Sequence, residues 1–114
     1  MADYITITPT DGTWVIRAGG AVLGESTRAL SLKEGTYDPV IYFPREDIAM
    51  EFLDASDKTT RCPHKGDASY FTIVTKSTTL QNAVWSYEAP FEAVAAIKEH
   101  LAFYTGDLVT VEKV

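Results

Sequence analysis

The chain has 114 residues, of which 46% are hydrophobic and 23% charged, and its formal net charge is −6 at pH 7. This size and composition predict one globular domain, residues 1–114, that buries a core of its own. The ten Lys and Arg residues are outnumbered by sixteen Asp and Glu and form no basic run, so we expect neither nucleic acid nor a membrane surface as a partner.

Most of the chain has the pattern of short β-strands. Stretches rich in β-branched and aromatic residues recur between turn-forming Gly, Pro and Asp residues. On this basis eight strands are predicted, over residues 4–8, 13–17, 21–24, 27–32, 40–43, 68–75, 82–87 and 108–112.

Two short helices are predicted, and a proline opens each of them. Pro44 precedes Arg45–Leu53, where apolar residues recur at the 3.6-residue spacing of a helix. Pro90 precedes the second helix, which runs from Phe91 to about residue 97. Residues 101–104 could extend that helix, but their aromatic pair and the glycine that follows favour a return to strand.

The expected fold is α+β and mainly β. About eight short, mostly antiparallel strands would form a partly closed sheet or barrel-like sandwich with two short helices. Residues 54–67 are polar and rich in turn formers, and we predict a loop there. A doubly wound parallel sheet is not expected, because strands and helices do not alternate along the chain.

The segment Thr59–Tyr70 holds the widest range of reactive side chains, including the only cysteine and one of two histidines. Cations beside Cys62 would favour its thiolate, the form that acts as a nucleophile, so Cys62 and His64 are candidate catalytic residues. The alternative is that Cys62 is an inert core residue, with His64 and Lys65 in a turn that Gly66 closes. We expect no bound metal or cofactor, since structural zinc needs four N or S ligands.

A second cluster lies where the fifth predicted strand meets the first predicted helix. Tyr42, Arg45 and Asp47 occur together there, and the planar fork of Arg45 suits a carboxylate or phosphate. Asp47 could accept a hydrogen bond from Lys65 or Arg45. The alternative interpretation is an ion pair that only fixes the local fold.

Aromatic residues on the predicted strands form a third group. Trp85 and Tyr87 are two residues apart and therefore share a face, where they could stack on a flat ligand; the alternative is a core with phenol groups at its rim. The expected ligand-binding residues are Tyr42, Arg45, Asp47, Lys65, Tyr70, Trp85 and Tyr87.

Four motifs resemble one known family, the domain-of-unknown-function family numbered 427. They are Tyr-Phe-Pro-Arg-Glu-Asp at 42–47, Cys-Pro-His-Lys-Gly at 62–66, Trp-Ser-Tyr at 85–87 and Ala-Phe-Tyr at 102–104. The resemblance covers nearly the whole chain and implies a compact β-rich domain with no established reaction. The nucleotidyltransferase-like label sometimes given to this family finds no support here, since the chain has neither a glycine-rich phosphate cradle nor an Asp-x-Asp pair.

The functional expectation is a small-molecule site, binding or weakly enzymatic, between the Cys62–Tyr70 loop and the Tyr42–Asp47 turn. Arg45 and Lys65 would hold an anionic group. The alternative is a non-catalytic protein-interaction domain, such as a homodimer formed through strand edges. One cysteine cannot form an internal disulfide, and neither a signal peptide nor a membrane span is seen, so we expect a cytoplasmic location.

Overall fold

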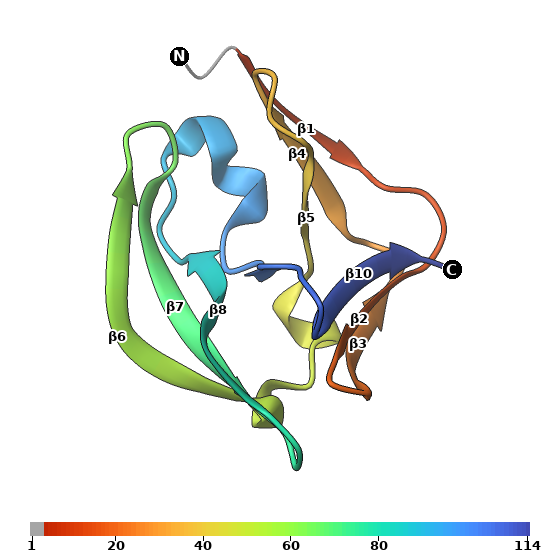
Figure 1. Ribbon diagram of the computed structural model, residues 1–114. Coiled ribbons are helices and arrows are strands. Elements are labelled where there is room, and N and C mark those ends of the chain that lie inside the picture. The colour runs from red at the N-terminus through yellow and green to blue at the C-terminus, as the bar shows by residue number, and fades with distance from the viewer. Residues whose placement is uncertain (1–3) are drawn as a thin grey trace.

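The computed structural model describes residues 4–114. Residues 1–3 lie outside the described residues. They belong to the predicted 1–114 domain and to the N-terminal segment in which we expect no signal peptide. Ten strands are found in the described part of the chain (Figure 1): β1 Ile5–Pro9, β2 Trp14–Ala18, β3 Ala21–Ser26, β4 Leu30–Glu34, β5 Val40–Tyr42, β6 Leu53–Cys62, β7 Gly66–Val74, β8 Thr79–Tyr87, β9 Ala102–Phe103 and β10 Val109–Lys113.

The strands pair antiparallel throughout and form three sheets, ordered β1-β4-β5, β10-β2-β3 and β6-β7-β8-β9. The prediction of a mainly β, mostly antiparallel fold is confirmed. None of these three sheets closes into a barrel among residues 4–114. An isolated bridge between Phe43 and Leu101 links the first sheet to the third.

The predicted helix Arg45–Leu53 is wrong. The chain forms two single 3-10 turns, η2 (Arg45–Asp47) and η3 (Met50–Phe52), and Ile48 between them is extended, with φ −109° and ψ 137°. Ile48 forms an antiparallel bridge with Gly24, and the amide of Ala49 donates to the carbonyl oxygen of Leu23 at 2.8 Å. Contacts with β3 thus replace the helical hydrogen bonds that the local pattern favours.

The second predicted helix is a 3-10 helix as well, η4 (Glu92–Ile97), with non-helical backbone angles at Val94. It ends before residue 101, and the expected return to strand is confirmed by β9. No helix among residues 4–114 is long and apolar enough to cross a membrane.

The predicted loop over residues 54–67 is also wrong, because most of it is strand β6. Its side chains are nearly all exposed, so the apolar alternation by which a strand is recognised is absent. Backbone pairing with β7 holds it, from Leu53 opposite Ile73 to Cys62 opposite Gly66. The reactive segment around Cys62 is therefore a β-hairpin with a short turn.

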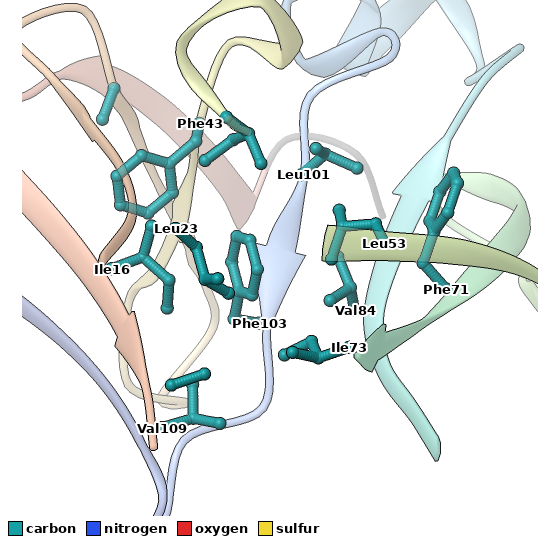
Figure 2. Close-up of a cluster of buried hydrophobic side chains, with 13 residues drawn as sticks. Ile16, Leu23, Phe43, Leu53, Phe71, Ile73, Val84, Leu101, Phe103 and Val109 are labelled. Carbon is teal, nitrogen blue, oxygen red and sulfur yellow. The ribbon is translucent and has the colours of Figure 1, made fainter. Parts of the chain in front are cut away.

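The core consists of two clusters on opposite faces of the β6-β7-β8-β9 sheet. Figure 2 shows the first, in which Phe103 lies between Ile16 and Leu23 on one side and Ile73 and Val84 on the other. The second contains Leu32, Tyr42, Ala68, Tyr70, Tyr87, Val94, Ile97 and Ala102. Neighbouring strand residues point to opposite faces, so β7, β8 and β9 supply both clusters. The candidate site lies at the rim of the second.

Candidate functional site

A pocket of about 270 Å³ opens at the second cluster. Strands β4, β5, β7 and β8, the β6–β7 turn and the loop after β4 all contribute to its wall. Five residues predicted to bind a ligand meet there. The lining residues are Leu32, Glu34, Tyr37, Asp38, Val40, Tyr42, Lys65, Tyr70, Trp85, Tyr87 and Tyr104.

Lys65 is buried in the wall of this pocket, with 8% of its surface exposed. Its Nζ donates to Oε1 of Glu34 at 2.7 Å and lies 5.9 Å from the ring centre of Tyr87. Burial acts to lower the pKa of Lys65, but hydrogen bonds with Glu34 and Cys62 outweigh it, so the pKa is raised. The wall therefore carries a charged but internally balanced pair.

Glu34 is a member of the site that sequence reasoning missed. It ends β4, 31 residues before its partner Lys65, and its own neighbourhood shows no motif. A carboxylate at the end of a strand is ordinary, and only the long-range placement of β4 opposite the β6–β7 turn brings it to Lys65.

Of the five tyrosines that line the pocket, three are buried: Tyr42, Tyr70 and Tyr87. The hydroxyl of Tyr42 accepts a hydrogen bond from Nε1 of Trp85 at 3.2 Å, and the hydroxyls of Tyr70 and Thr60 are 2.9 Å apart. Burial raises the pKa of Tyr42, against a smaller opposing effect of the Trp85 bond. Burial also raises the pKa of Tyr87, helped by the nearby Tyr42. Tyr42 and Tyr87 therefore keep their protons at neutral pH.

An aromatic pair stands at the mouth of the pocket. The rings of Trp85 and Tyr104 are 4.6 Å apart between centroids and tilted by 48°, and Tyr104 is about half exposed. The predicted shared face of Trp85 and Tyr87 is borne out by their presence in one pocket wall. An apolar ring surface thus adjoins the polar groups of the interior.

Arg45 does not line the pocket. Its Nε donates to the carbonyl oxygen of Glu99, and its Nη2 donates to Oγ of Ser86 and to Oε2 of Glu88, each at 3.0 Å. The guanidinium also lies 5.5 Å from the ring centre of Phe71. These contacts fasten η2 to β8 and to the segment before β9. Arg45 thus serves the fold, and its expected ligand-binding role stays a prediction.

Asp47 is not among the residues that line this pocket either, and its expected ligand-binding role stays a prediction. Its carboxylate accepts from Oγ of Ser26 at 2.6 Å and from Nη2 of Arg28 at 3.1 Å, instead of from Lys65 or Arg45. The Ser26 hydrogen bond, supported by Arg28, lowers the pKa of Asp47 against the opposing effect of burial. The contact joins η2 to β3.

Cys62 and His64 stand beside the site without lining it. Cys62 is the half-buried last residue of β6 and packs against the second cluster. His64 lies in the turn, with its ring edge-on to Tyr4 at 5.7 Å between centroids. In residues 4–114, no group of three or more His, Cys, Asp or Glu side chains is placed to hold a metal ion.

A larger hollow of about 400 Å³ lies between the start of β8 and the loop after β9, lined by residues 80–83 and 104–109. Of the residues in that lining, Asp107 is the only one with a charged side chain. We place the candidate site in the smaller pocket because it contains a largely buried ion pair and buried phenols.

The family described as domain of unknown function (DUF427) matches residues 6–114. No curated protein matches the chain.

Proposed function

The chain belongs to the DUF427 family, and we propose that its pocket around Lys65 binds a small molecule. The family description names no activity, so the proposal is based on the geometry of the pocket. The observation that carries it is the convergence of Tyr42, Lys65, Tyr70 and Trp85, from separate parts of the chain, on one cavity.

The composition of this pocket supports the proposal. Ligand sites are mostly apolar and aromatic, with a few polar groups that orient the ligand. This cavity has aromatic walls, one ammonium group and one paired carboxylate. Its volume of about 270 Å³ suits a compact molecule, at the small end of known ligand sites.

The proposed roles follow from position. Trp85 and Tyr87 would cover the apolar part of the ligand, and Lys65 would anchor its polar part. Because Cys62 and His64 stand outside the lining, we propose a binding site and assign no reaction to it. A cytoplasmic setting belongs to the same proposal and rests on the single cysteine.

The test uses the side-chain N–H resonances of the two tryptophans in ¹⁵N-labelled protein. A set of soluble monocyclic aromatic compounds of different charge is added, and we expect some of them to shift the Trp85 resonance. Trp14 is the internal control, since its Nε1 donates to the carbonyl oxygen of Asp11, outside the pocket.

Lys65→Met should weaken the binding of those compounds that carry a neutral or anionic polar group, because it removes the ammonium and keeps most of the stem. Lys113→Met is the matched control, since Lys113 pairs with Asp11 at the surface. A Trp85 resonance that no compound moves would contradict the proposal.

A second proposal, the protein-interaction domain, is favoured by one observation. Strand β6 is a long exposed edge of its sheet, and such edges can pair with a second chain. The same strand carries Asp54, Asp57, Lys58 and Arg61 and an irregularity between Ala55 and Thr59, features that discourage edge pairing. Light scattering over a range of protein concentrations tests the proposed homodimer, since dimerisation would double the monomer mass.

A further inference from the structure

The side chain of Tyr87 lines the pocket, and its hydroxyl has no hydrogen-bond partner among residues 4–114. Tyr87 as a whole is 6% exposed. Burial raises its pKa, so the group stays an O–H donor at neutral pH. No side-chain N or O atom that is shut off from solvent within residues 4–114 lacks a partner, so this hydroxyl is open to solvent in the pocket, and a ligand acceptor would take the place of water there.

Tyr42 offers a second donor in the same place. Its oxygen already accepts from Trp85 Nε1, so its own hydrogen remains for another acceptor, and none is found in the described part of the chain. The pKa of Tyr42 is raised by burial, which keeps this hydrogen on the oxygen. The hydroxyls of Tyr87 and Tyr42 can therefore both donate a hydrogen bond to a ligand.

The carboxylate of Glu34 can accept a hydrogen bond from a ligand in the pocket. Oε1 of Glu34 is occupied by Lys65, and within residues 4–114 no hydrogen bond reaches Oε2. Lys65 and Glu34 balance each other in charge, and Asp38 adds one negative charge to the lining. The pocket therefore has no surplus positive charge to hold an anion.

Resting on the proposed function, we infer that the ligand carries a neutral amide head group on a flat ring. The carbonyl oxygen accepts from the hydroxyls of Tyr87 and Tyr42, and the amide N–H donates to Oε2 of Glu34. The ring lies against the apolar wall formed by Trp85 and Val40. The anionic group expected from the sequence relied on Arg45 and Lys65 together, and Arg45 is engaged elsewhere.

Three probes of nearly equal shape test the head group: benzamide, benzoate and benzamidinium. They are neutral, anionic and cationic, and each is titrated into ¹⁵N-labelled protein while the indole resonances of Trp85 and Trp14 are followed. Benzamide should bind about tenfold more tightly than either ion. Benzoate lacks the N–H donor and repels Glu34, and benzamidinium lacks the acceptor for the phenols.

Two variants test which side chains recognise the head group of the probe. Tyr87→Phe removes only the hydroxyl and should weaken benzamide binding about fivefold; it should fold normally, since that hydroxyl makes no hydrogen bond in the described chain. Tyr4→Phe, on an exposed tyrosine outside the pocket, is the matched control. Glu34→Gln should raise benzoate affinity relative to benzamide, because it removes the repelling charge.

The outcomes separate the two proposals. If benzoate or benzamidinium binds most tightly at Trp85, the amide inference is overturned and the small-molecule site stands. If benzamide binds equally well to Tyr87→Phe, the assigned phenol donor is wrong. If no probe moves Trp85, the proposed function fails and the inference fails with it.

Discussion

Arg45 and Lys65, which the sequence assigned to one anion-binding role, serve different purposes in the folded chain. The fork of Arg45 is used within the fold, on Glu99, Ser86 and Glu88. Lys65 faces the pocket, where it meets Glu34. A guanidinium can hold several acceptors at fixed angles, which suits the joining of separate segments, whereas the ammonium of Lys65 completes a single ion pair.

We therefore predict that Arg45→Ala destabilises the protein by about 2–3 kcal/mol and leaves the response of Trp85 to benzamide unchanged. The loss is large because Ser86, which is fully buried, loses its partner. Urea denaturation measures it. The control is Arg17→Ala, which breaks an exposed pair with Glu112 and should cost less than about 1 kcal/mol. Equal losses in the two variants would contradict the assigned role.

At the level of elements, Gly24 explains why the predicted first helix does not form. A Cβ on Gly24 would overlap the carbonyl oxygen of Asp47 and lie 2.8 Å from Cδ1 of Ile48. The missing side chain lets β3 approach η2 closely enough for the bridge between Gly24 and Ile48. That bridge holds Ile48 extended and separates η2 from η3.

Gly24→Ala should therefore cost about 2–3 kcal/mol of stability, because the clash involves backbone atoms that cannot move independently. Gly106→Ala is the matched control, since nothing lies within 4 Å of its Cβ position, and it should change stability by less than about 0.5 kcal/mol. Thermal unfolding of both variants checks this. A Gly24→Ala protein as stable as the Gly106→Ala protein would show that β3 and η2 are less closely packed.

At the level of the whole molecule, the two core clusters are joined through shared strands. In β8, Val84 belongs to the first cluster and Tyr87 to the second, and in β9 Phe103 and Ala102 divide in the same way. One cluster cannot lose its packing while these strands keep the other intact. The clusters should therefore unfold as one cooperative unit.

The fluorescence of each tryptophan reports on the unfolding of a different cluster, because Trp14 packs against the first cluster and Trp85 against the second. In the single-tryptophan variants Trp14→Phe and Trp85→Phe, the fluorescence midpoint in urea should coincide with the circular-dichroism midpoint of the same variant. Separate midpoints within one variant would show that the clusters unfold independently and would contradict a single domain.

Several features of this protein follow from local pattern alone. Alternating β-branched and aromatic residues predict most of the strands, and their period of two places Trp85 and Tyr87 on one face. The motif around Cys62–Gly66 directs attention to Lys65, and the ordered motifs point to the family. These inferences succeed because side-chain alternation and turn chemistry are properties of neighbouring residues.

Other features were decided only by tertiary structure. Strand β6 has few buried side chains and is held by its pairing with β7, while Glu34 meets Lys65 across 31 residues and Arg45 meets Ser86 across 41. The sequence by itself determined a mainly β chain with reactive and aromatic motifs. Which polar groups face the pocket depended on the packing of distant strands, because the partner of a long charged side chain is set by the acceptors that the fold brings within reach.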